Sequence, residues 1–269
     1  RGLHIEHCRD GIVSENVVTR SPIAGISSIN RNVIWANNIF DSEKSVSTAL
    51  LGAPGTFIAL TDTNCIYRGN TFRNWTGQSG SYFVRFWGND LIIESNIFEP
   101  NRNDALVWGY GGNLRNRFIG NQFRGKINLN VALTTGVSVE RNEFWGGTVI
   151  ADNTTDVLIE NNTFRPNVGD NTGLGINVYN STRPFVTGNK FYNPASYCIE
   201  NGATTNAIFE NNTFFRTHAN AAGNTYFYVN TGISATGVKK TAPDRYNVIR
   251  DYLNNETYYI GNTGTPTAY

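Results

Sequence analysis

The sequence predicts an all-β fold, a parallel β-solenoid of about nine to ten coils. Three observations support it: a phrase that returns, short β-forming runs in every repeat, and almost no helical periodicity. The phrase is "IENNTF" at residues 159–164, which comes back as "FENNTF" at 209–214. A phrase repeated along one chain is typical of a backbone that itself repeats.

The repeat is an Asn followed two positions later by a Phe, as in "NNIF", "GNTF" and "RNEF". Successive Asn residues lie 20 to 32 positions apart, so a constant core carries loops of different lengths. The Asn residues are Asn38, Asn70, Asn96, Asn121, Asn142, Asn162, Asn189 and Asn212, with a weaker one at Asn16. The Phe residues are Phe40, Phe72, Phe98, Phe123, Phe144, Phe164, Phe191 and Phe214.

Each repeat also holds two short β-type runs, one before the Asn and one after the Phe. "DLIIES" and "DVLIEN" are examples of the first, and "KINLNVAL" and "LGINVYN" of the second. They are rich in Val, Ile and aromatic residues and are bounded by Gly, Asn, Asp and Thr. Repeats of this length without a helix exclude leucine-rich and ankyrin units, and a propeller blade needs about 40 residues. A solenoid remains, with coils about 4.8 Å apart.

Stacking gives the motif a physical role. Equivalent residues of successive coils lie above one another, so the repeated Asn should form a ladder of amides that hydrogen-bond to each other. The Phe two positions later should face inward and stack on the Phe of the neighbouring coils.

The motif resembles that of the right-handed parallel β-helix superfamily, the pectate-lyase-like fold whose repeats read like "vxIexNxF". The resemblance covers residues 1 to about 231 and implies a right-handed, single-stranded parallel β-helix over 1–231. Residues 232–269 break the rhythm and are charged and Tyr-rich. They are expected to form an irregular cap or oligomerisation segment, because the last coil otherwise exposes unpaired strand edges.

Bulk composition excludes several classes of function. Lys and Arg total 22 against 21 Asp and Glu, so no basic excess points to nucleic acid. No apolar run is long enough for a membrane span. The chain starts "RGLHIEHCRD" and contains no Met, which indicates a piece trimmed from a longer chain. No metal or cofactor is expected; the alternative is a metal held by His4, Glu6 and His7 with Asp62.

One exposed face is expected to bind carbohydrate. In the β-type runs after the Phe, the residues expected to point inward are Phe86, Val107, Val131, Ile150, Val178 and Ile199. The residues that directly follow them are expected to share one outward column: Trp87, Trp108, Ala132, Ala151, Tyr179 and Glu200. Aromatic rings stack on sugars, and amides and Arg bond hydroxyls and charged substituents. The predicted carbohydrate-binding residues are Arg85, Trp87, Trp108, Asn130, Asn177 and Tyr179. The alternative is a solvated sheet with Trp tucked under a loop.

Two pairs of carboxylates are candidates for catalysis, since the His-based and multi-Asp signatures of known β-helix enzymes are absent. Asp152 and Glu200 are expected two coils apart on the aromatic face, roughly 10 Å at the backbone, which suits an inverting glycosidase. Glu140 and Glu160 are the rival pair, one coil apart at roughly 5 Å, which suits a retaining mechanism or an ordinary solvated column.

The fourth position before each Asn points outward, yet it is mostly apolar. Its residues are Ile12, Ile34, Ile66, Ile92, Arg117, Ser138, Leu158, Phe185 and Ile208. Such a column favours a buried contact with identical chains, or with a covering loop.

This organisation resembles a bacteriophage tailspike. The resemblance implies a homotrimer outside the cell or on the virion surface that binds and cleaves bacterial surface polysaccharide, as an endo-glycosidase rather than a lyase. A non-catalytic glycan-binding adhesin or receptor-binding spike is the alternative, as is a pectate-lyase-like lyase or epimerase.

Overall fold

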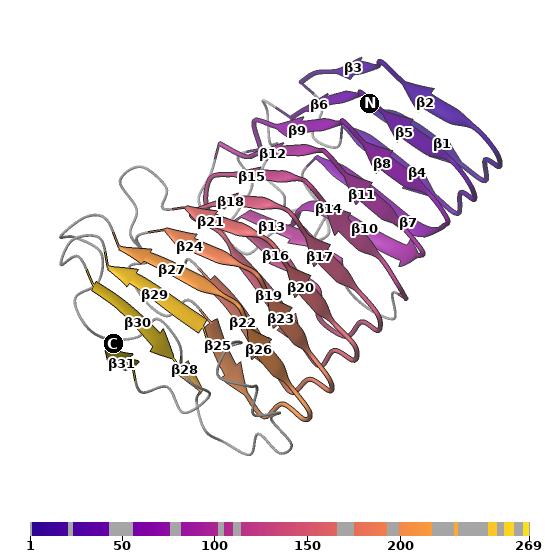
Figure 1. Cartoon of the computed structure of the whole chain (residues 1–269). Coiled ribbons are helices and arrows are strands. Elements are labelled where there is room, and N and C mark those ends of the chain that lie inside the picture. Colours follow the sequence, from indigo (N-terminus) through magenta and orange to yellow (C-terminus); the bar gives the residue numbers. More distant parts are fainter. Residues whose placement is uncertain are drawn as a thin grey trace.

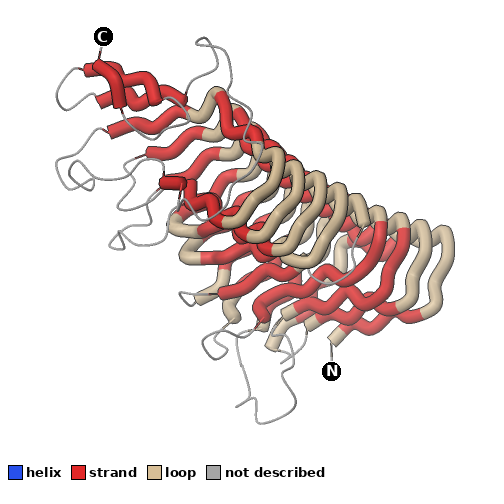
Figure 2. The backbone as a smooth tube through the Cα atoms, turned by 90° about the horizontal axis from the view of Figure 1, so that it is seen from below, coloured by secondary structure: helices blue, strands red, loops and turns tan. Residues whose placement is uncertain are grey.

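The computed structural model describes residues 2–20, 24–42, 56–75, 82–101, 105–109, 114–165, 175–192, 199–216, 229–230, 247–251, 256–260 and 266–268. Within these residues the chain winds into a parallel β-helix whose coils lie side by side along one axis (Figure 1). The N- and C-termini lie at opposite ends of the axis (Figure 2). No helix long and apolar enough to cross a membrane is found among the described residues.

Each coil contributes strands to three sheets, although the sequence indicates only two β-type runs per repeat. The additional strand contains the Phe of the Asn-x-Phe motif, a stretch too short to stand out as a run of its own. Sheet A has ten strands: β1 (Leu3–Glu6), β4 (Gly25–Ser28), β7 (Phe57–Thr63), β10 (Tyr82–Asn89), β13 (Ala105–Trp108), β16 (Ile127–Asn130), β19 (Thr148–Asp152), β22 (Gly175–Tyr179), β25 (Ile199–Gly202) and β28 (Val229–Asn230).

Sheet B contains the runs that precede the Asn. It has nine strands: β2 (Ile12–Ser14), β5 (Ile34–Ala36), β8 (Ile66–Arg68), β11 (Ile92–Glu94), β14 (Arg117–Ile119), β17 (Ser138–Glu140), β20 (Leu158–Glu160), β23 (Phe185–Thr187) and β26 (Ile208–Glu210). The predicted fourth-position column is confirmed here, because its nine residues pair one to the next from Ile12 to Ile208.

Sheet C contains the strands with the repeated Phe. Nine of its twelve strands are parallel members of coils: β3 (Val17–Val18), β6 (Ile39–Asp41), β9 (Thr71–Arg73), β12 (Ile97–Glu99), β15 (Gln122–Arg124), β18 (Glu143–Trp145), β21 (Thr163–Arg165), β24 (Lys190–Tyr192) and β27 (Thr213–Arg216).

The described parts of residues 232–269 extend sheet C. They form β29 (Asn247–Asp251), β30 (Glu256–Ile260) and β31 (Pro266–Ala268). β29 pairs parallel with β27, while β30 and β31 add antiparallel strands. These three strands therefore cover the edge that β27 would otherwise expose. The division of the chain at residue 231 stays a prediction.

The Asn ladder is confirmed and fully hydrogen-bonded. From Asn16 to Asn212, Nδ2 of each Asn donates to Oδ1 of the Asn in the next coil at 2.9–3.1 Å. Asn142 is typical: its Oδ1 accepts from N and Nδ2 of Asn121, and its Nδ2 donates to the Phe118 carbonyl and to Asn162. Each buried amide thus uses its two donors and two acceptor sites, so the turn between sheets B and C repeats without a polar penalty.

The inward Phe stack is also confirmed, from Phe40 to Phe191. Neighbouring rings are 4.5–5.4 Å apart and within 12° of parallel. Each ring is completely buried. The side chain of Phe214 lies outside the described residues.

The residue before each ladder Asn adopts a left-handed backbone conformation. Its φ lies between 54° and 65° in every described coil, at Glu15, Asn37, Gly69, Ser95, Gly120, Arg141, Asn161, Gly188 and Asn211. Asn and Gly tolerate this region with little strain. The repeated dipeptide therefore encodes both the turn and the amide that stabilises it.

Candidate functional site

The outer face of sheet A carries the residues that the sequence singles out, and hydrogen-bonded strand pairs fix their columns. Arg85 lies opposite Trp108, and Trp108 lies opposite Asn130. The same column then continues through Ile150, Asn177 and Glu200. Five of the predicted or candidate residues are therefore in one outward column.

A second outward column lies two positions further along the strands. Trp87 belongs to it by its place two residues after Arg85. Asp152 pairs with Tyr179, and the Leu133 amide donates to the Asp152 carbonyl, which places Ala132 opposite Asp152. The sequence alignment is correct for Trp87, Ala132 and Tyr179.

The alignment is wrong at Trp108, Ala151 and Glu200. Trp108 and Glu200 are two positions away from the expected column, and Ala151 is one position away and buried, with Ile150 outward instead. Strand alternation fixes which face a residue occupies, but a two-residue slip leaves that face unchanged. Loops of different lengths precede these strands, so the sequence does not fix their register.

Aromatic rings gather where β10 and β13 meet. The rings of Tyr82 and Trp108 stack with centroids 3.9 Å apart. The Arg85 guanidinium carbon lies 4.6 Å from the centre of the Trp87 ring, 5.7 Å from that of Trp108 and 5.9 Å from that of Tyr82. Trp87 is 38% exposed. We call Tyr82, Arg85, Trp87 and Trp108 the aromatic cluster.

A β-bulge fixes how Trp87 is presented. The pairing of β10 with β7 shifts by one residue between Trp87 and Gly88. A Cβ on Gly88 would lie 2.1 Å from the Asp62 carbonyl oxygen, so only glycine fits this close approach.

Polar side chains follow the aromatic cluster along sheet A. Asn130 and Asn177 are half-buried in the Arg85 column, and Asn130 Oδ1 accepts a hydrogen bond from the Ala132 amide at 2.9 Å. Asp152 is half-buried and accepts from Asn180 Nδ2 at 2.9 Å. The face thus combines rings with amide and carboxylate groups that can bond sugar hydroxyls.

Asp152 and Glu200 are two coils apart but staggered. Asp152 shares a column with Tyr179 and Gly202, whereas Glu200 lies opposite Asn177. Two coils and two residues along the strand separate their backbones by roughly 12 Å, more than the roughly 10 Å expected from the sequence. The side chain of Glu200 lies outside the described residues.

Glu140 and Glu160 do pair directly on adjacent strands, as predicted. Both are half-buried on sheet B, away from the aromatic cluster on sheet A. Glu140 lies 3.4 Å from Arg117 Nη2, and Glu160 accepts from Asn161 Nδ2 at 3.0 Å. Each carboxylate therefore has its own partner, as in a solvated column.

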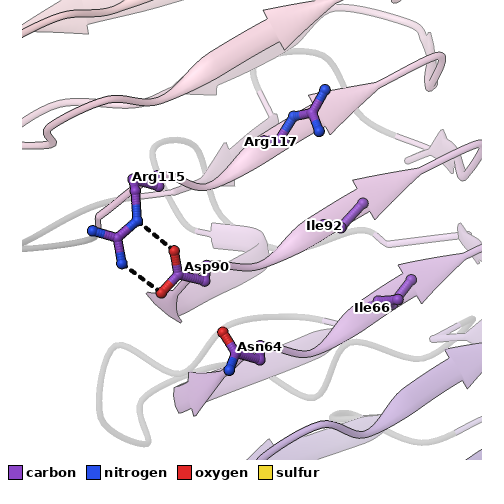
Figure 3. A pocket seen from close by; sticks show the side chains of 6 residues that line it. All are labelled: Asn64, Ile66, Asp90, Ile92, Arg115 and Arg117. Carbon is purple, nitrogen blue, oxygen red and sulfur yellow. Dashed lines mark hydrogen bonds and ion pairs between the residues drawn. The ribbon is translucent and has the colours of Figure 1, made fainter.

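A pocket of 390 Å³ on sheet B was not foreseen from the sequence (Figure 3). Ile66 and Ile92 form its floor, and Asn64, Asp90, Arg115 and Arg117 line it. Arg115 binds Asp90 through Nε at 2.6 Å and Nη2 at 2.8 Å, and this hydrogen bonding raises the pKa of Arg115. The fourth-position column of the sequence already indicated the apolar residues Ile66 and Ile92. The ion pair could not be predicted in the same way, because Asp90 and Arg115 come from neighbouring coils.

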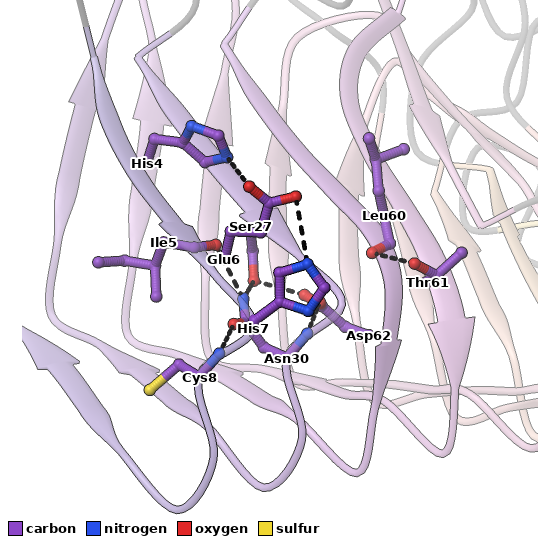
Figure 4. Close-up of polar contacts among 10 residues, drawn as sticks. All are labelled: His4, Ile5, Glu6, His7, Cys8, Ser27, Asn30, Leu60, Thr61 and Asp62. Atoms are coloured by element: carbon purple, nitrogen blue, oxygen red, sulfur yellow. Dashed lines mark hydrogen bonds and ion pairs between the residues drawn. The ribbon is translucent and has the colours of Figure 1, made fainter.

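The histidines of the first coil do not assemble with Asp62. His4 and His7 each lie 3.8 Å from Glu6. Asp62 is completely buried and accepts hydrogen bonds from the Ser27 hydroxyl and the Asn30 backbone amide (Figure 4). It also accepts a hydrogen bond from the Tyr67 hydroxyl. Burial raises the pKa of Asp62. Among the described residues no three His, Cys, Asp or Glu side chains are grouped to hold a metal ion.

Solved structures with the same architecture come from several kinds of protein. The Dettilon tailspike protein matches with a TM-score of 0.55 and 14% identity over 80% of this chain and 48% of its own. PfbA, a surface adhesin of Streptococcus pneumoniae, matches with a TM-score of 0.56 and 12% identity over 98% of this chain and 69% of its own. The Agl-KA catalytic domain matches with a TM-score of 0.50 and 12% identity over 87% of this chain and 53% of its own.

These likenesses establish a shared fold, and this chain spans only about half the length of the tailspike and of the Agl-KA domain. No curated protein matches the chain by sequence. The family model described as "Right handed beta helix region" matches residues 57–214 and 128–253, which together cover most of the chain. The chain therefore belongs to the right-handed β-helix family.

Proposed function

We propose that this chain is the carbohydrate-binding β-helix of a tailspike-like protein that binds and cleaves bacterial surface polysaccharide. The aromatic cluster is the observation that carries the proposal. Trp87 exposes ring surface beside a cation, and half-buried amides continue along the same face. This is the chemistry by which proteins stack on sugar rings and bond their hydroxyls.

The face also has a shape that suits a polymer. Successive coils repeat about every 4.8 Å, so the columns of Arg85 and Trp87 run along the solenoid axis. A glycan chain lying on these columns would contact the aromatic cluster first and then Asn130, Asp152 and Tyr179. The proposed location, outside the cell or on the virion surface, follows from where such glycans occur.

For cleavage, Asp152 and Glu200 are the proposed acid and base of an endo-glycosidase. Both belong to sheet A, and Asp152 lies opposite Tyr179 within the same face. Inverting enzymes hold their carboxyl groups ~6.5–9.5 Å apart to leave room for a water. Glu140 and Glu160 remain the rival pair, on sheet B.

The wider stagger of Asp152 and Glu200 specifically favours a second candidate, a glycan-binding adhesin without turnover. Reducing-end release from capsule and O-antigen preparations separates the two. Depolymerisation by Asp152 and Glu200 predicts release that Asp152→Asn and Glu200→Gln abolish while binding persists. Release that Glu140→Gln and Glu160→Gln abolish instead would assign cleavage to the rival pair. Binding without release in the unmodified protein would establish the adhesin, and no binding to any preparation would overturn both.

The chain is also proposed to act as a homotrimer that packs through sheet B. Ile12 is 70% exposed, and the column from Ile34 to Ile92 continues this apolar stripe at half-buried positions. Sedimentation should give a trimer that Ile92→Asp dissociates, while Ile97→Asp on sheet C leaves it intact. A monomer at every concentration would contradict this assembly.

A further inference from the structure

Three arginines of the described chain lie over aromatic rings, and their electrostatic surroundings differ. Arg124 lies 5.8 Å from the centre of the Trp145 ring, and Arg165 lies 4.7 Å from that of Tyr192. Both belong to sheet C. Arg85 lies over Trp87, Trp108 and Tyr82 on sheet A. A ring attracts a cation with its face, so all three sites gain from the same interaction.

The two arginines on sheet C also have acceptors for their N–H groups. Arg165 Nε binds Glu143 at 2.7 Å. Arg124 donates to Gln122 Oε1 at 3.1 and 2.8 Å and lies 3.9 Å from Glu99. Their charge is therefore balanced within the protein.

Among the described residues, no carboxylate pairs with the guanidinium of Arg85. The arginine–carboxylate pairs of that part of the chain involve Arg73, Arg115, Arg117, Arg124, Arg165 and Arg183. Arg85 Nε is buried and has no hydrogen-bond partner there. The carboxylate of Asp152, on the same face of sheet A, is three coils away from Arg85 and accepts a hydrogen bond from Asn180.

Aromatic faces do not satisfy a guanidinium completely. Its five N–H donors lie in the plane of the group, whereas the rings interact with its faces. A guanidinium held between rings is pre-organised, so little side-chain entropy is lost when an anion binds it. A carboxylate or phosphate accepts two of its N–H groups at once.

We infer that Arg85 is an anion-binding group and that the glycan bound on sheet A carries a carboxylate or phosphate substituent beside the sugar that stacks on Trp87. This inference rests on the proposed function, because it assigns the chemical class of the glycan at the same face. A neutral glycan would leave the Arg85 charge uncompensated while displacing water from it, which is unfavourable.

The test uses pairs of glycans that differ only in charge. Uronic-acid polysaccharides are compared with the same material after carboxyl reduction, and phosphate-containing polysaccharides with the same material after dephosphorylation. Binding is measured by affinity electrophoresis at low and high salt. The charged member of at least one pair should bind about 10- to 100-fold more tightly than its neutralised counterpart, and added salt should narrow that difference. Which treatment abolishes binding identifies the anion.

Two variants give an independent readout. Arg85→Gln should lower affinity for the charged glycan by about 10- to 100-fold, so that the charged glycan loses its advantage over its neutral counterpart. Arg85→Lys should restore only part of that loss, because an ammonium group lacks the planar fork. Arg165→Gln on sheet C is the matched control and should leave binding unchanged.

The outcomes separate this inference from the function on which it rests. Equal binding of charged and neutralised glycans by the unmodified protein overturns the inference and leaves carbohydrate binding standing. Unchanged affinity of folded Arg85→Gln for the charged glycan has the same meaning. Failure to bind any glycan overturns the proposed function itself.

Discussion

The outer faces of sheets A and C both carry aromatic and arginine side chains, but they differ in what those side chains contact. On sheet C, Tyr192 stacks on Phe215 at 4.6 Å, and Arg165 covers Tyr192 while binding Glu143. On this sheet, aromatic and charged side chains of adjacent coils therefore pair with one another along the solenoid axis. On sheet A, Trp87 is exposed and Arg85 has no carboxylate partner among the described residues.

The difference shows that composition alone does not identify a binding surface. Both faces are rich in the residue types that bind glycans, yet on sheet C these residues form cross-strand pairs that stabilise the sheet. On sheet A, by contrast, a tryptophan ring is exposed and an arginine has no carboxylate partner among the described residues, which leaves this surface available to a ligand. Four changes break or sharpen this comparison.

The largest effect is expected from the ladder that supports both faces. Asn142→Ala would leave the Asn121 amides and the Phe118 carbonyl without buried partners. Each unsatisfied buried group costs about 1–3 kcal/mol, so unfolding free energy should fall by about 3 kcal/mol or more. Chemical denaturation measures this, with Thr163→Ala, at a half-buried outward position on sheet C, as the control. Unchanged unfolding free energy in Asn142→Ala would contradict the idea that the ladder stabilises the scaffold of both faces.

Replacing one outward-facing tryptophan on each sheet, the exposed Trp87 on sheet A and the half-buried Trp145 on sheet C, should separate the two faces. Trp87→Ala should weaken glycan binding by about 2 kcal/mol with little change in stability, because the exposed ring is proposed to contact the sugar. Trp145→Ala on sheet C should instead lower stability by about 1–2 kcal/mol through lost packing and leave binding intact. Calorimetric binding and thermal denaturation of both variants check this. Equal effects on binding would remove the distinction between the faces.

Titration of Asp62 should change the stability of the scaffold beneath sheet A. Burial raises its pKa in the folded protein, so the folded state holds the proton more tightly than the unfolded chain. Its contribution is most favourable below the unfolded pKa, about 3.9, and is lost as pH rises through the higher folded pKa. Asp62→Asn should flatten this part of the stability profile measured by denaturation. An unchanged profile would mean that the carboxylate is not desolvated.

The smallest effect is expected from the ion pair on sheet C. Glu143→Gln removes the charged partner of Arg165, which is partly exposed. Such pairs contribute about 0.2–1 kcal/mol, and salt screens them. Thermal denaturation at low and high salt should show a small loss that disappears at high salt. New binding of acidic glycans to sheet C in this variant would sharpen the comparison, since it would reproduce an uncompensated arginine there.

Much of the fold could be predicted because its signal is local and repeated. Residues equivalent to Asn142 and Phe144 occur in almost every coil. Each Asn bonds the Asn of the next coil, and each Phe stacks on the Phe of the next coil. The fourth-position column on sheet B follows from a constant count back from the Asn. The third strand was missed because the residues after the Asn are too few to form a visible β-type run.

Less of the candidate site could be predicted. The sequence placed Trp87 and Tyr179 on one outward face, but loops of unequal length shifted Trp108 and Glu200 by two positions. The pocket of Figure 3 depends on an ion pair between Asp90 and Arg115 in adjacent coils, which no single repeat encodes.

The sequence by itself determined the coil, because each Asn-x-Phe motif carries its own turn, amide and inward ring. Only the tertiary structure decided which arginine has a carboxylate beside it. Arg85 and Arg165 occupy similar sequence environments, next to aromatic residues in short strands. The carboxylate partner of Arg165 comes from the adjacent coil. Charge compensation therefore depends on distances of a few ångströms that the stacking of coils sets.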